Sequence, residues 1–210
     1  VSDHREDYYA FTIVPGFSTP DWAKGAVMYQ IFVDRFCNGD PANDVEDREY
    51  IYIGEPSTKV RDWNQTPAAR DIHNFYGGDL QGVMDKLDYL QELGVEVVYF
   101  NPLFVSPSNH KYDIKYQKRT GDIRNLEASN KLFARLVEEM HKRGMRVILD
   151  GVFNHCGSFN KWMDRERIYE PQPEYPKGAY VSADSPYREF FHFFDNRNEA
   201  WPYNGSYDGW

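Results

Sequence analysis

Short apolar segments alternate with longer helical segments between residues 27 and 149, and this order constrains the fold most. Apolar runs at Val27–Val33, Val95–Phe100 and Val147–Leu149 have the length of buried strands. Between them, apolar residues recur at helical spacing from Asp79 to Gly94 and over Leu126–Arg143. This order predicts an α/β fold with parallel strands and right-handed crossovers. Periodicity alone leaves a closed barrel and an open doubly wound sheet as alternatives.

Each predicted helix carries one apolar face, which we expect to cover the sheet. These faces comprise Leu80, Val83, Met84, Leu87, Leu90 and Leu93 in the first helix and Leu132, Phe133, Leu136, Val137 and Met140 in the second. Two stretches lack such a pattern. A long polar loop is expected from about Cys37 to Tyr76, and such loops are usually functional. An irregular, aromatic segment is expected from Cys156 to Trp210.

Polar side chains follow the third predicted strand closely. Asp150 ends the run Val147–Leu149, and Asn154 and His155 come within the same short loop. Polar groups at the carboxyl end of a buried parallel strand are typical of α/β active sites. The alternative is a solvated strand end with a chance histidine, because polar residues are common in loops.

The segment Leu149–His155 resembles the first signature region of the α-amylase family of glycoside hydrolases, with Gly151 where Val or Ala is frequent. Met28–Phe36 and Leu93–Phe104 resemble the first and second barrel strands of that family. The resemblance implies a partial (β/α)8 TIM barrel, with about the first three βα units and an insertion after strand three. It divides the chain into a leading segment or linker (1–24), barrel (25–155) and insertion (156–210).

Oxygen-bearing side chains alternate with turn formers from Asn38 to Asp44. Asn, Asp, Gly and Pro are also ordinary turn residues, so composition alone fits either a turn or a calcium loop. The loop resembles that of the neopullulanase, cyclomaltodextrinase and maltogenic amylase branch, which uses a later Gly-Gly-Asp-Leu, here Gly77–Leu80. The resemblance implies a structural calcium held by Asn38, Asp40, Asn43, Asp44, the Gly77 carbonyl and Asp79.

The loop after the second strand contains Asn109–Asp113, which resembles the same branch. The resemblance implies that Tyr112 stacks on the sugar at the cleavage point, with His110 close by; an aromatic face suits the apolar face of a sugar ring. It also implies that His155 hydrogen-bonds this sugar and that Asp150 supports the site without attacking. The role of Asn154 stays open. The segment from Asp113 to Gly121 is shorter than in the family, so either the loop is trimmed or residues are absent from the numbered chain; the subsites near it stay open.

The resemblance implies a retaining α-glucan hydrolase that cuts α-1,4 bonds, with α-1,6 bonds as an alternative. Its nucleophile and acid/base would come from later strands, so no catalytic residue is expected in this chain. The chain would then be the first portion of a parent enzyme and inactive alone. The alternatives are a transglycosylase of the same family and a non-catalytic glucan-binding or structural module. No Gly-x-Gly-x-x-Gly or Walker loop follows a strand, which disfavours nucleotide binding.

Composition restricts the partners further. The net charge of -9 and the lack of a basic stripe argue against nucleic acid. No apolar run approaches the roughly 20 residues of a membrane span. Cys37 and Cys156 are too few for a disulfide framework, so a cytoplasmic location is the default, with secretion as the alternative. A Cys156–His155 nucleophile pair is disfavoured because no orienting partner is evident. A homodimer of the parent enzyme stays open.

Overall fold

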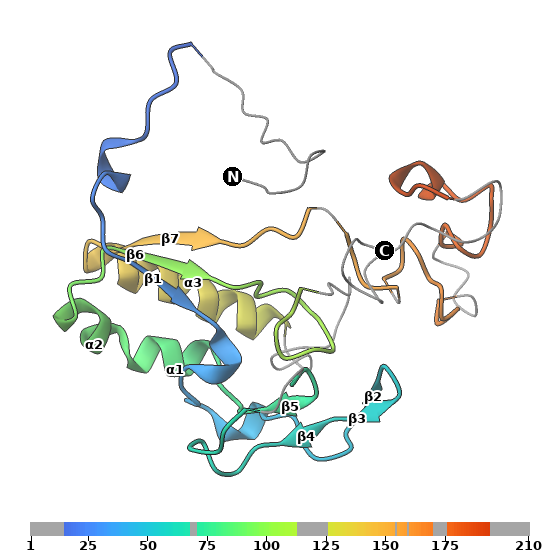
Figure 1. Cartoon of the computed structure of the whole chain (residues 1–210), viewed down its shortest axis with the longest axis horizontal. Helices are drawn as coiled ribbons and strands as arrows, with labels where there is room; N and C mark the ends of the chain where they lie inside the picture. Colours follow the sequence, from blue (N-terminus) through green and yellow to red (C-terminus); the bar gives the residue numbers. More distant parts are fainter. Residues whose placement is uncertain are drawn as a thin grey trace, which may run out of the picture.

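Three parallel strands form the centre of the fold. The structure is a computed structural model, and it describes residues 15–67, 71–112, 126–153, 155–158, 160–169 and 176–193. The strands are β1 (Met28–Ile31), β6 (Val97–Phe100) and β7 (Arg146–Leu149), hydrogen-bonded in the order β1-β6-β7. They point toward the same end of the sheet, and the loops that follow them gather there (Figure 1). The predicted parallel βα pattern is therefore confirmed.

The helices lie on one face of this sheet (Figure 1). The second predicted helix is α3 (Leu126–Lys142). The first is not continuous: it divides into α1 (Leu80–Asp85) and α2 (Leu87–Glu92). At Lys86 the backbone leaves the helical region, with φ -104° and ψ 8°, and the Lys86 amide bonds to the carbonyl three residues earlier. Buried residues continue on both sides of this break, so the apolar face is preserved.

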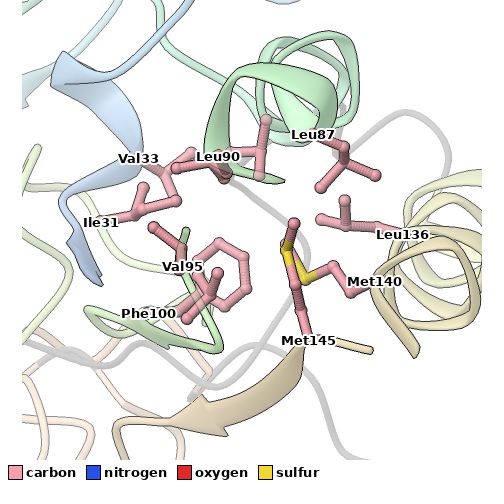
Figure 2. Packing of buried hydrophobic residues seen from close by; sticks show 11 residues of the cluster. Ile31, Val33, Leu87, Leu90, Val95, Phe100, Leu136, Met140 and Met145 are labelled. Atoms are coloured by element: carbon pink, nitrogen blue, oxygen red, sulfur yellow. The ribbon is translucent and has the colours of Figure 1, made fainter. Parts of the chain in front are cut away.

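The core fills the space between these helices and the sheet (Figure 2). Leu136 and Met140 of α3 lie beside Leu87 of α2 in Figure 2, and Leu90 and Phe100 belong to the same cluster; all five are at most 1% exposed. Strand residues alternate between faces. The helix-facing rows are Tyr29, Val98 and Val147, then Ile31, Phe100 and Leu149. The opposite face carries Gln30, Tyr99 and Ile148 in one row.

The prediction of a buried strand at Val147–Leu149 is wrong for the described residues. Leu149 is 45% exposed, and Val147 and Ile148 are half-buried. The reason is position: β7 pairs with β6 on one side and is the edge of the described three-stranded sheet.

The long loop after β1 is more regular than expected. It contains the antiparallel pair β2 (Ile51–Tyr52) and β3 (Glu55–Pro56), and the parallel pair β4 (Thr58–Lys59) and β5 (Asn74–Phe75). Ile53 and Gly54, between β2 and β3, have φ of 49° and 78°. Two positive φ values in a two-residue loop are the geometry of a tight hairpin turn. The prediction of a long polar loop did not include these strands, because each has two residues and no readable period.

The remaining described segments are short and irregular. Three 3₁₀ turns lie at Asp21–Ala23 (η1), Val33–Arg35 (η2) and Pro41–Asn43 (η3), and a fourth, η5, spans Arg188–Phe190. The segment Tyr9–Val14, whose apolar residues favour a strand, lies outside the described residues, as do the segment Asp113–Gly121 and Asn154. Within the described part, no helix combines the length and apolar character that a bilayer crossing requires.

Candidate substrate site and metal loop

The carboxyl ends of the three strands bring polar groups to one edge of the sheet. The ladder continues one residue past each strand: the Asn101 amide donates to the Ile31 carbonyl at 3.0 Å, and the Asp150 amide donates to the Phe100 carbonyl at 3.1 Å. By strand alternation, Asn101 and Asp150 lie on the face away from the helices. The Gln30 side-chain amide donates to Asn101 Oδ1 at 2.6 Å on this face.

Asp150 accepts hydrogen bonds from two phenols. The Tyr112 hydroxyl donates to Asp150 Oδ2 at 2.8 Å, and the Tyr99 hydroxyl also bonds to the Asp150 carboxylate. The bond to Asp150 raises the pKa of Tyr99, whereas partial burial followed by the same carboxylate raises the pKa of Tyr112 to about 12. Both phenols therefore stay protonated at neutral pH and donate to Asp150.

Sequence reasoning did not select Tyr99. The signal was nevertheless present: Tyr99 lies two residues before Asn101, and Ile148 beside it lies two residues before Asp150. A period of two places Tyr99 and the first polar residue after its strand on the same face.

His110 lies beside Tyr112 in the loop after β6. Their ring centroids are 5.9 Å apart, and the Tyr112 amide donates to His110 Nδ1 at 3.1 Å. The Ser108 hydroxyl lies 3.2 Å from the same ring nitrogen. The neighbouring Asn109 is 2% exposed and donates to the carbonyls of Asp71 and Asn74 at 2.7 and 3.0 Å. These bonds fix the loop to the segment that leads into β5.

The structure thus brings together three of the four predicted sugar-binding residues: His110, Tyr112 and Asp150. His155, the fourth, is half-buried and follows Asp150 in the same loop. Its contact with a sugar stays a prediction. Cys156 is buried, and burial raises the pKa of its thiol to about 12. A thiol that stays protonated is a poor nucleophile, which argues against the Cys-His pair.

The predicted metal loop converges on Asp79, the N-cap of α1. Asp79 Oδ1 accepts from the Gly82 amide at 2.6 Å and the Gly39 amide at 3.2 Å. Its Oδ2 accepts from the Asp40 amide at 2.8 Å and the Asn43 side chain at 3.0 Å. Asp79 therefore joins the loop Asn38–Asp44 to the start of α1.

Three other predicted ligands, Asn38, Asp44 and Gly77, lie against one another, whereas Asp40 is exposed and its Oδ1 accepts from the Ala42 amide at 3.1 Å. Asn38 Nδ2 donates to Asp44 Oδ1 at 2.7 Å, while Asn38 Oδ1 is buried without a hydrogen-bond partner. Gly77 has φ +81°, and a Cβ there would overlap Asp44 Oδ1. Across the described part of the chain, no three His, Cys, Asp or Glu side chains converge on one metal point. Asp40, Asp44 and Asp79 therefore do not surround one point in this structure. The other half of the predicted set consists of amide and peptide oxygens, which suit a hard cation.

One further observation indicates that this set of oxygens suits calcium. An unpaired buried amide oxygen costs free energy. Rotating the Asn38 amide by half a turn would place its oxygen toward Asp44, an arrangement that is favourable once a cation lies between the two oxygens. The orphaned Asn38 Oδ1 therefore fits a ligand role.

Asp34 supports the same region and was not selected from the sequence. It is 5% exposed and accepts from the amides of Tyr76 and Gly77 at 3.2 and 3.4 Å. Burial raises the pKa of its carboxyl to about 6, against the lowering effect of these amides. The Asp34 carbonyl also accepts from Gly78 at 2.9 Å. The end of β1 is thereby tied to the metal loop.

Comparison with known proteins decides the family. The sequence profile of the alpha-amylase catalytic domain matches residues 30–209. The chain belongs to the alpha-amylase family. It is 39% identical to the amylopullulanase of Thermoanaerobacter thermohydrosulfuricus over 98% of its length, and 49% identical to neopullulanase 2 of Thermoactinomyces vulgaris over 67%. The predicted family and its neopullulanase-like branch are confirmed.

A solved structure supports the fold. The type III pullulan hydrolase from Thermococcus kodakarensis matches 93% of this chain with a TM-score of 0.69 and 30% identity. The predicted partial TIM barrel is therefore confirmed. The chain spans 34% of that solved chain, 14% of the amylopullulanase and 21% of neopullulanase 2.

Proposed function

We propose that this chain is the first part of the catalytic domain of a retaining α-glucan hydrolase that cuts α-1,4 bonds and, as an alternative specificity, α-1,6 bonds. The observation that carries this proposal is the Asp150 carboxylate, held by two phenols at the carboxyl end of β7. Barrel enzymes place their sites at this end. The similarity to an amylopullulanase, a neopullulanase and a pullulan hydrolase supports an α-glucan substrate.

In this proposal, the chain supplies one wall of the substrate cleft. Tyr112 covers the apolar face of the sugar at the cleavage point, and His110 and His155 hydrogen-bond its hydroxyl groups. Asp150 fixes the Tyr112 ring through the 2.8 Å bond and accepts from Tyr99, so it orients neighbours and does not attack. The nucleophile and the acid/base would come from carboxylates outside this chain.

An assay of the full-length protein tests the activity. Reducing ends released from maltooligosaccharides and from pullulan would measure α-1,4 and α-1,6 cleavage separately. Asp150→Asn is expected to lower the rate on both substrates because the amide cannot accept from two phenols as strongly. Calorimetric binding of maltooligosaccharides with no cleavage would instead support a non-catalytic glucan-binding module. Products that are longer than the substrate would indicate transglycosylation.

We further propose a structural calcium at the loop Asn38–Asp44. Asn38, Asp40, Asn43, Asp44, Asp79 and the Gly77 carbonyl would hold it, and the orphaned Asn38 oxygen supports this set. Bound there, calcium would offset two of the three negative charges of the carboxylates and stabilise the start of α1. The test is the melting temperature of the full-length protein after chelation, with calcium restored in steps. An unchanged melting temperature would contradict the proposal.

The assignment of 25–155 to the barrel and 156–210 to the insertion, a cytoplasmic location, and the lack of nucleic-acid or membrane partners stay predictions. The low cysteine count supports the location. Size-exclusion chromatography of the full-length protein would decide whether the parent enzyme is a homodimer.

A further inference from the structure

A lysine lies against the proposed calcium loop. Lys59, in β4, places its ammonium 3.1 Å from Asp44 Oδ2 and 2.7 Å from Glu46 Oε1. The Asp44 side chain is 6% exposed and that of Lys59 is 25% exposed. This ion pair is therefore partly shielded from solvent, and salt screens it less than a fully exposed pair.

The two carboxylate oxygens of Asp44 contact different groups. Oδ1 faces Asn38, which donates to it at 2.7 Å, and lies against Gly77. Oδ2 faces Lys59. One oxygen of Asp44 thus faces the proposed calcium site, and the other faces the Lys59 ammonium. We propose that Lys59 sets the calcium affinity of this loop, because its ammonium neutralises Asp44 from behind and repels a divalent cation bound in front.

Charge repulsion is expected to outweigh the help that Lys59 gives in orienting Asp44. An ammonium and a divalent cation on the two oxygens of one carboxylate lie on the order of 5 Å apart, and even a water-like dielectric then weakens binding about tenfold. Orientation is the smaller effect when Lys59 is changed, since Asp44 Oδ1 is held by Asn38 in the metal-free loop and would be held by the cation in the calcium-bound loop.

The same contact has a consequence for the metal-free protein. Without a cation, Asp44 is an almost buried carboxylate, and such a group needs a partner of opposite charge. Lys59 supplies that partner, so the loop folds without calcium. Removing the ammonium is expected to lower the metal-free melting temperature and to enlarge the rise that calcium causes.

The experiment measures calcium binding to the chelated full-length protein by titration calorimetry. Lys59→Met removes the charge at similar length, and Lys59→Gln removes it while keeping a donor to Asp44. Both are expected to bind calcium about tenfold more tightly than the wild type. The control is Arg61→Met, which removes a cation from an exposed pair with Asp47 (2.7 Å) and should leave the calcium Kd within about twofold.

This inference rests on the proposed calcium site, and the outcomes separate the two. If the wild type binds calcium and both Lys59 variants bind it equally or more weakly, the role of Lys59 is overturned and the site stands. If neither the wild type nor the variants bind calcium, both proposals are wrong. Binding by the Lys59 variants alone would support the inference in its strongest form. If Lys59→Met does not fold, the calcium affinity of Lys59→Gln provides the test.

Discussion

The Tyr112 hydroxyl donates a 2.8 Å hydrogen bond to Asp150 Oδ2 and thereby joins the loop after β6 to the end of β7. The two residues are far apart in sequence, and Tyr99 completes the arrangement from within β6. A carboxylate that accepts from two phenols is held on two sides. The Tyr112 ring, which we propose to face the sugar, is thus oriented by the Asp150 carboxylate.

Tyr112→Phe is expected to lower kcat/KM of the full-length protein about 10- to 100-fold, because a hydrogen bond to a charged group contributes about 1.5–3 kcal/mol. The phenylalanine ring can still cover the sugar, so the loss in kcat/KM would measure how much the hydrogen bond to Asp150 contributes by orienting the ring. Tyr99→Phe is the matched control: it removes the other phenol from Asp150 and leaves Tyr112 bonded. Steady-state kinetics on maltotriose would measure both. Equal effects of the two variants would argue against a special role of Tyr112.

Tyr112 is expected to ionise near pH 12, above the ordinary phenol pKa of 10, because burial and then the Asp150 charge disfavour the phenolate. The folded pKa exceeds the unfolded one, so its contribution to stability is full below pH 10 and is lost as the pH rises through 12. The wild-type minus Tyr112→Phe difference spectrum should show no phenolate absorbance at pH 10. Asp150→Asn should move the ionisation to lower pH. An ordinary titration near pH 10 in the wild type would contradict the hydrogen bond.

The βα order and the place of Asp150 could be predicted from local pattern, whereas His110 and Tyr112 were predicted from the family resemblance. Their contact with a sugar stays a prediction. Asp150 ends an apolar run, and His110 and Tyr112 belong to a recognisable motif. Tyr99 was missed because an aromatic residue inside a strand is ordinarily core, and its role depends on the neighbour that β7 provides. Ser108 was missed for a related reason: its contact with His110 is a property of the loop conformation.

Other features needed the tertiary structure. Asp34 stands in a 3₁₀ turn after β1, and its burial depends on contact with the backbone at Tyr76 and Gly77. The contact of Lys59 with Asp44 joins two segments of a loop whose short strands have no periodicity. The break at Lys86 has no Pro or Gly to mark it. Local pattern alone could not find these features.

The two cysteines are expected to differ in reactivity. Cys156 is buried and burial raises its pKa to about 12, whereas Cys37 is half-exposed. Because the thiolate is the reactive form, Cys156 should resist alkylation in the native protein. Iodoacetamide at pH 8, followed by peptide mass spectrometry, should label Cys37 first and Cys156 only after denaturation. Native labelling of Cys156 at the rate of Cys37 would revive the Cys-His pair as a reactive site.

Gly77→Ala is expected to remove the stabilisation that we propose calcium gives, because the new methyl group would overlap Asp44 Oδ1 and Asn38 Nδ2. Gly54→Ala is the matched control: Gly54 has φ +78°, close to the +81° of Gly77, but nothing lies within 4 Å of its Cβ position. Both variants carry a backbone cost of about 1–2 kcal/mol. Only Gly77→Ala should also lose the calcium-dependent rise in melting temperature of the full-length protein. If both variants keep that rise, Gly77 is a turn glycine and the metal does not bind at its carbonyl.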